Sequence, residues 1–310
     1  MDWKAGWTTL RHTAKEFIDD NALRLSAALA YYSVFSLAPL LTITMAVAGA
    51  LLGEEAARGQ LEAQLRSGLG ASGAFAIQDM VAHARKPGEN LLAGTVGVLM
   101  LLFGAGGVFG QLQDALNTIW GVKSKSGRGL MGLIKDRFLS FTMVLGTAFL
   151  LLTSMVLTAA LEAMSKHAET IVHLPAQVWA VIGLVVSFGV ITLLFAAIFQ
   201  ILPDAQVKWR HVWVGAIFTA TLFVAGKFAI GWYLGREATA SAYGSAGALA
   251  LVLLWVYYSA MILLFGAEFT QVWANRKGAA IQPDTDAEFI NPVEDQPDIV
   301  QDKPAQSGRA

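Results

Sequence analysis

The 310-residue chain contains no cysteine. Disulfide bonds, thiolate metal sites and cysteine nucleophiles are therefore excluded. Charge is also scarce, because only 15% of the residues are Asp, Glu, Lys or Arg. The formal net charge of −1 says little, since the positions of the charges carry more information than their sum in a chain of this kind.

The common catalytic and metal-binding motifs are absent as well. The five histidines show no HExxH or HxxxH spacing, and the HAETIVH stretch at 167–173 does not place both imidazoles on one helical face. The glycine-rich stretch FGAGGVFG, residues 103–110, lacks the GK[ST] ending of a phosphate loop, and its GxxxG step favours close helix packing. The sequence predicts no catalytic residue, no metal site and no cofactor, so we do not expect an enzyme.

The chain is instead rich in long apolar runs. Hydrophobic residues make up 55% of it, and the mean hydropathy of +0.53 exceeds that of ordinary soluble domains. About 20 apolar residues span a hydrocarbon core, which is longer than the apolar region of a signal peptide. Six segments reach this length: 25–53, 91–112, 138–161, 176–202, 212–235 and 246–274. None alternates as membrane strands do, so the predicted fold class is an all-α membrane protein, a bundle of six transmembrane helices.

Lys and Arg are distributed unequally between the two sets of loops. One side carries Lys4, Arg11, Lys15, Arg24, Lys123, Lys125, Arg128, Lys135, Arg137, Lys208, Arg210, Arg276 and Lys277. The other side carries Lys166 and Arg236 in its short loops, and four more cations in one long loop. Because cytoplasmic loops are enriched in Lys and Arg, the first side is predicted to be cytoplasmic, together with both termini.

The segments outside the spans differ in character. Residues 1–24 have an apolar and a charged helical face, which predicts an amphipathic helix lying on the cytoplasmic leaflet. Loop 54–90 is predicted to form two short external helices, and residues 25–278 are predicted to form the transmembrane domain around it. The proline-rich, acidic segment 279–310 is expected to be a disordered cytoplasmic tail. Tryptophans near the predicted span ends, where indoles prefer the headgroup layer, are Trp120, Trp179, Trp209, Trp213, Trp232 and Trp273.

Several motifs resemble one family in the same order. LSAALAYYSVFSLAP at 25–39 resembles the first-helix signature of the YihY/BrkB family of bacterial inner-membrane proteins. Further matches are LQDALNTIW at 112–120, LPDAQVKWRHVWVGA at 202–216 and YGSAGALALVLLWVYYSAMILLFGAEF at 243–269. The resemblance covers residues 1–278. It implies a location in the bacterial inner membrane and a link to envelope integrity, serum resistance and proposed transport; members were once labelled as a ribonuclease.

A transporter needs polar groups inside the bilayer and helices that are broken or flexible. The candidate substrate pathway consists of Tyr31, Tyr32, Ser33, Ser36, Pro39, Lys227, Tyr257 and Tyr258. Pro39 removes a backbone donor, which predicts a bend and a polar pocket beside the preceding hydroxyls. The alternative, that these hydroxyls only hold helices together, stays open.

Two charges lie within the predicted spans. A rise of ~1.5 Å per residue places Lys227 roughly 22 Å and Glu268 ~9 Å from the cytoplasmic edge, so the two are not expected to pair. We expect Lys227 to extend its ammonium group outward. Arg24 matches the depth of Glu268, which predicts that Glu268 forms a structural ion pair with Arg24 or accepts from a backbone donor at the cytoplasmic end; a carboxylate hydrated at the inner interface is the alternative.

The combined prediction is a transporter-like inner-membrane protein that handles a lipid or amphiphile and supports envelope integrity. An exporter of a soluble solute and a non-transporting envelope scaffold are the alternatives. A ribonuclease is disfavoured because Asp114, Asp136 and Asp204 are scattered among loops rather than clustered around a metal. Membrane lipids are the expected partners and nucleic acid is not; a homo-oligomer or an envelope protein partner stays open.

Overall fold

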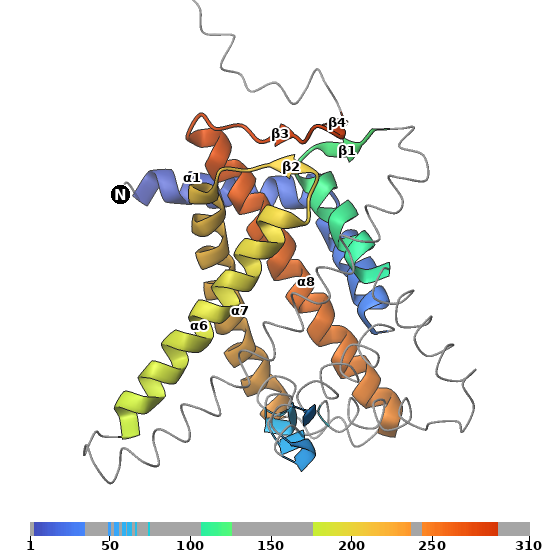
Figure 1. Cartoon of the computed structure of the whole chain (residues 1–310), viewed down its shortest axis with the longest axis vertical. Coiled ribbons are helices and arrows are strands. Elements are labelled where there is room, and N and C mark those ends of the chain that lie inside the picture. Colours follow the sequence, from blue (N-terminus) through green and yellow to red (C-terminus); the bar gives the residue numbers. More distant parts are fainter. Residues whose placement is uncertain are drawn as a thin grey trace, which may run out of the picture.

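The computed structural model describes residues 3–34, 107–125, 176–236 and 244–290, with scattered positions between 49 and 74. This part of the chain is mostly helical (Figure 1). Its labelled elements are α1 (Trp3–Asp19), β1 (Val122–Ser124), α6 (Ala176–Ile201), β2 (Ala205–Gln206), α7 (Trp209–Arg236), α8 (Gly244–Arg276), β3 (Gln282–Pro283) and β4 (Ala287–Phe289). Residues 22–34 and 107–119 are helical as well.

Three of the described helices are long and apolar enough to cross a membrane. The qualifying stretches are Val181–Ile201 in α6, Trp209–Ala229 in α7 and Val252–Arg276 in α8. They coincide with the last three spans expected from the sequence. The external helices expected in loop 54–90 and the span expected at 138–161 lie largely or wholly outside the described residues, so the six-helix bundle stays a prediction.

The helices α7 and α8 pack closely because glycines of each face threonines of the other. A Cβ atom added to Gly215 would overlap the side chain of Thr270, and one added to Gly266 would overlap Thr219. Each threonine hydroxyl donates to the glycine carbonyl one turn earlier in its own helix, at 2.7 Å for both Thr219 to Gly215 and Thr270 to Gly266. These hydroxyls are therefore satisfied inside their helices, and small residues set the contact, as is common between membrane helices.

The core described by the structure lies where helix 107–119 meets α6 and α8. Trp120 is 2% exposed, and its Nε1 atom donates to the carbonyl oxygen of Ala267 in α8 at 3.2 Å. Its ring contacts Phe199 edge to face, and Phe199 stacks on Phe195 of the same helix. A buried indole needs a partner for its N–H, and the Ala267 carbonyl supplies it.

Helix α1 lies across one end of the spanning helices (Figure 1). It packs on α8, where the Phe17 and Phe265 ring centroids are 5.5 Å apart and Nη1 of Arg276 donates to Oγ1 of Thr9. On its other face, Trp7 and Ile18 are 64% and 67% exposed. An apolar strip left uncovered by protein fits a helix lying at the lipid interface.

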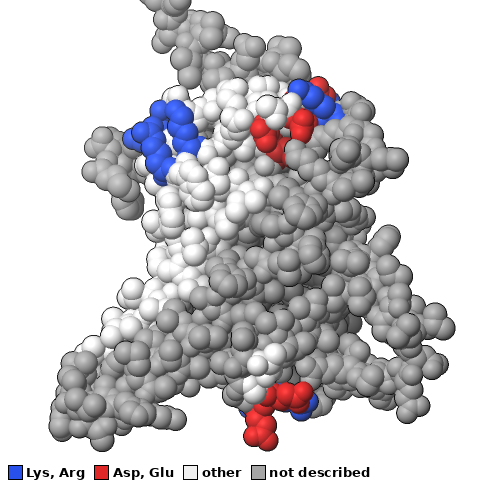
Figure 2. Space-filling model, viewed as in Figure 1, with Lys and Arg blue, Asp and Glu red and all other residues white. Residues whose placement is uncertain are grey.

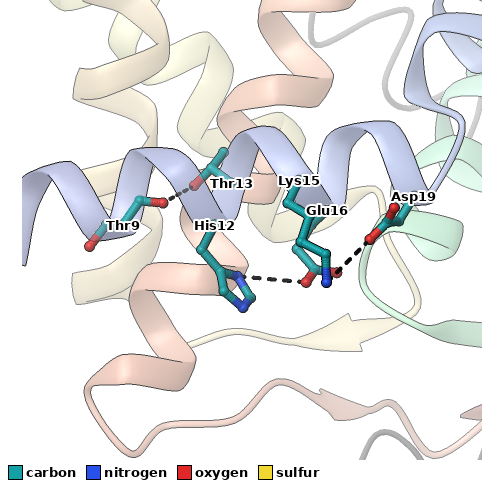
Figure 3. Close-up of polar contacts among 6 residues, drawn as sticks. All are labelled: Thr9, His12, Thr13, Lys15, Glu16 and Asp19. Carbon is teal, nitrogen blue, oxygen red and sulfur yellow. Dashed lines mark hydrogen bonds and ion pairs between the residues drawn. The ribbon is translucent and has the colours of Figure 1, made fainter.

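Within α1, polar side chains contact one another along the helix (Figure 3). The buried Thr13 hydroxyl donates to the carbonyl of Thr9 at 3.0 Å. Two further contacts join residues four apart, His12 to Glu16 at 3.6 Å and Lys15 to Asp19 at 3.8 Å. Because pairs this exposed contribute little stability, α1 is held mainly by its packing on α8.

The chain turns from α1 into the helix 22–34 at Asn21. This residue has a φ angle of 54°, which a non-glycine side chain rarely adopts but asparagine tolerates. Its carbonyl accepts the backbone N–H groups of Arg24 and Leu25, and its Nδ2 donates to the carbonyl of Asp19 at 3.3 Å. Asn21 thus ends the surface helix and begins the next one within two residues.

Two small antiparallel sheets cover the same end of the molecule as α1, which we call the strand end (Figure 1). The strand β4 pairs with β1 in the register Val122 to Phe289, and β3 pairs with β2. Ile281 and Ala287 of this segment are buried. The expectation of disorder from residue 279 is therefore wrong for residues 279–290, because their backbone completes two ladders with loops far away in the sequence; residues 291–310 lie outside the described part.

Candidate functional site

The first group of candidate pathway residues lies on the helix 22–34. Tyr31 and Tyr32 are 60% and 41% exposed, and their rings meet edge to face with centroids 5.7 Å apart. A Cβ atom at Gly107 would lie 3.2 Å from Cδ1 of Tyr32, so the missing side chain there makes room for this ring. Ser33 is half-buried, whereas Ser36 and Pro39, with the bend expected at Pro39, lie outside the described residues.

The second group lies between α7 and α8. A Cβ atom at Gly226 would overlap the ring and hydroxyl of Tyr258, so this tyrosine packs directly on the α7 backbone. Lys227, the next residue of α7, and Tyr257 are half-buried. Close packing of Tyr258 favours the reading in which its hydroxyl-bearing ring holds two helices together.

The structure does not form the ion pair expected between Arg24 and Glu268. Arg24 is exposed, whereas Glu268 is fully buried and its carboxyl lies close to that of Asp20. The charged groups that act on Glu268 are the carboxyls of Asp20 and Glu16, at the end of α1 that packs on α8. Glu268 is thus buried beside other acids and does not form the ion pair with Arg24 that its depth predicted.

A cluster of polar residues around Asp204 joins three distant segments at the strand end. Its carboxylate accepts hydrogen bonds from Gln113 Nε2 at 3.2 Å, Asn117 Nδ2 at 3.0 Å and Ser124 Oγ at 2.6 Å. Its backbone N–H donates to Asn117 Oδ1 at 2.8 Å, and its carbonyl accepts the N–H of Asp284 at 2.9 Å. The Asp204 latch, as we call these five residues, fixes helix 107–119 and the segment 277–290 to the loop before α7.

Sequence reasoning placed Asp204 only among scattered acids. The signal that could have found the latch was present, because Gln113 and Asn117 are four residues apart and so share one face of their helix. Both belong to LQDALNTIW, and Asp204 belongs to LPDAQVKWRHVWVGA. The two resembling motifs therefore meet each other in space.

Replacing Asp204 by alanine is expected to lower the free energy of unfolding by about 1–3 kcal/mol, because the buried amides of Gln113 and Asn117 would lose their acceptor. Thermal unfolding of the detergent-solubilised protein measures this. Asp19→Ala, which removes a mostly exposed carboxylate on α1, is the matched control. An unchanged midpoint for Asp204→Ala would show that the latch adds no stability.

Acidic and basic side chains separate at the strand end. Figure 2 shows Lys and Arg gathered on one flank and Asp and Glu, mixed with Lys, on the other. The mixed flank lies over the paired strands, where Lys123 approaches Glu288 at 3.5 Å and Lys125 Nζ donates to the carbonyl of Thr285 at 2.8 Å. Within the described residues, no group of three or more His, Cys, Asp or Glu could hold a metal ion.

Comparisons with known proteins agree on one group of relatives. A family model described as "Virulence factor BrkB" matches residues 13–291. A UPF0761 membrane protein of Psychrobacter sp. (strain PRwf-1) is 26% identical over 264 residues, which is 84% of this chain and 47% of that protein. Others of the same name, from Alkalilimnicola ehrlichii and Azotobacter vinelandii, are each 30% identical and are covered to 58% and 61% of their length. The chain thus spans about half to three fifths of these relatives, and no solved structure matches it significantly.

Proposed function

Because the chain belongs to the BrkB virulence factor family of membrane proteins, we propose that it is a transporter-like protein that handles a lipid or amphiphile and supports envelope integrity. The exposed pair Tyr31 and Tyr32 carries the proposal. A tyrosine ring can lie against an acyl chain while its hydroxyl binds a headgroup oxygen. Polar side chains at membrane depth mark substrate pathways more often than they mark lipid-facing surface.

The proposal includes a location in the bacterial inner membrane, with both termini in the cytoplasm. It is supported by the strand end, where α1 and residues 277–290 lie together with the loops that carry Lys123, Lys125, Lys208 and Arg210. The enrichment of Lys and Arg at this end favours the cytoplasmic side. We further propose that the chain is not an enzyme and that its partners are membrane lipids rather than nucleic acid.

A non-transporting envelope scaffold is the second candidate. The contacts of Tyr258 with Gly226 and of Thr270 with Gly215 favour it, because they use hydroxyl-bearing side chains for helix packing. In a scaffold, the exposed tyrosines of helix 22–34 would contact another envelope protein or a second copy of the chain. The two functions differ in whether lipid moves.

Movement of a fluorescent phospholipid across vesicles containing the protein tests the proposal. The double variant Tyr31→Ala, Tyr32→Phe is expected to lower the protein-dependent rate about fivefold to tenfold, since a lost hydrogen bond is worth about 1 kcal/mol. Leu184→Ala, which shortens a comparably exposed side chain on α6, is the control. If the native protein moves no lipid, the scaffold is the better description. If the control slows movement equally, the tyrosines have no special part.

A further inference from the structure

Three cations lie together where α7 begins at the strand end. Lys208 and Arg210 lie on either side of the first residue of α7, and Lys277 directly follows the last residue of α8, which packs on α7. None of the three forms an ion pair with a carboxylate among the residues that the structure describes, and α7 has no acid in its first turn. Positive charge therefore accumulates here, and no ion pair to a carboxylate offsets it among the described residues.

The helix dipole of α7 and the ring of His211 add to this positive charge. The start of a 28-residue helix carries the positive end of its dipole, and the N–H groups of His211 and Val212 already donate to the carbonyl of Lys208. Nε2 of His211 accepts a hydrogen bond from Nε of Arg210 at 3.1 Å, so in the neutral ring the hydrogen is on Nδ1. This Nδ1 atom is buried and has no hydrogen-bond partner. Among the described residues, the cluster thus offers positive charge and no carboxylate to balance it.

Three indole rings lie on the same helix ends as the cations. Trp209 and Trp213, one turn apart on α7, are 53% and 40% exposed. Nζ of Lys277 lies 5.2 Å from the ring centroid of Trp273. Both α7 and α8 are long and apolar enough to cross a membrane, and the cluster lies at their ends. Exposed indoles beside cations at this depth are typical of the headgroup layer, where the ring contacts acyl chains and the cation contacts phosphate.

We propose that Lys208, Arg210 and Lys277, with Trp209 and Trp213, form a binding site for the headgroup of an anionic phospholipid. The phosphate oxygens supply the acceptors and the negative charge that the cluster lacks. The exposed indoles select a lipid over a soluble anion, because they bury apolar area only against acyl chains. This site goes beyond the proposed function, since it can anchor a fixed lipid whether or not the protein moves lipid.

Native mass spectrometry tests the site. It measures how much phosphatidylglycerol the protein retains when it is released from mixed micelles that also contain phosphatidylcholine. The triple variant Lys208→Gln, Arg210→Gln, Lys277→Gln is expected to bind phosphatidylglycerol on the order of a hundredfold more weakly, since each surface cation contributes about a factor of five. The matched control, Arg11→Gln, Lys15→Gln, Lys123→Gln, removes the same charge from exposed positions elsewhere.

Each outcome decides the proposal. Loss of phosphatidylglycerol binding in the triple variant but not in the control supports the site. So does partial recovery of binding when residue 210 of the triple variant is lysine in place of glutamine. Equal loss in the control, or retention in the triple variant, overturns it. If millimolar glycerol phosphate displaces bound phosphatidylglycerol as effectively as free lipid does, the ligand is not specifically a lipid. Because lipid movement is measured separately with the Tyr31 and Tyr32 variants, failure here leaves the proposed transport untouched, and the reverse also holds.

Discussion

Replacing Gly215 by alanine is expected to destabilise the packing of α7 on α8 by about 1–3 kcal/mol. The added methyl group would overlap the Thr270 side chain, whose hydroxyl is fixed by its hydrogen bond to Gly266. Thr270 is fully buried, so it has no open space into which to turn. The helices would have to separate, and with them the reciprocal contact of Gly266 with Thr219. The free energy of unfolding in detergent, followed by circular dichroism, measures the cost.

Gly189→Ala on α6 is the matched control for this prediction. A Cβ atom there would meet nothing within 4 Å, so the same substitution is expected to be neutral or to stabilise the helix by up to about 1 kcal/mol. Adding Thr270→Ala to Gly215→Ala removes the overlapping hydroxyl and should restore part of the loss. If both glycine variants behave alike, or if Thr270→Ala restores nothing, close approach at Gly215 does not limit stability.

The three helices that are long and apolar enough to cross a membrane were predictable, because burial in lipid requires long apolar runs, whatever packs beside them. The boundaries expected at 176–202, 212–235 and 246–274 follow the observed α6, α7 and α8 closely. The uneven distribution of Lys and Arg likewise assigned to one side of the membrane the loops that lie together at the strand end. These features depend on composition along the chain, which the sequence shows directly.

Features that depend on contacts between distant residues were not predictable in the same way. Residues 279–290 have a composition typical of disorder, yet they form β3 and β4 because the backbones of residues 122–124 and 205–206 are available to pair with them. The ion pair between Arg24 and Glu268 was expected only because the two residues lie at similar depth in the membrane. Depth fixes a position along the helix axis but not the direction in which a side chain points, and successive residues differ by about 100° around the axis.

Glu268 is the buried group whose replacement should stabilise the fold most. Its carboxyl is 0% exposed and lies against the carboxyls of Asp20 and Glu16. Two neighbouring carboxyls can at best share one proton, so the cost of removing this group from water is only partly offset. A side chain of similar length without polar oxygens would avoid that cost.

Glu268→Met is therefore expected to raise the free energy of unfolding by about 1–3 kcal/mol, measured by thermal and denaturant unfolding in detergent. Glu55→Met, at an exposed position, should change it by no more than about 0.5 kcal/mol. A Glu268→Met protein that unfolds more easily would mean that the carboxyl is stabilised by its surroundings more than its contacts show.

A stabilised protein would mean that the chain keeps an acid at the junction of α1 and α8 at the expense of its own stability. Because acids retained inside membrane spans at such a cost are functional by default, the same variant should then be assayed for lipid movement, where we expect a loss.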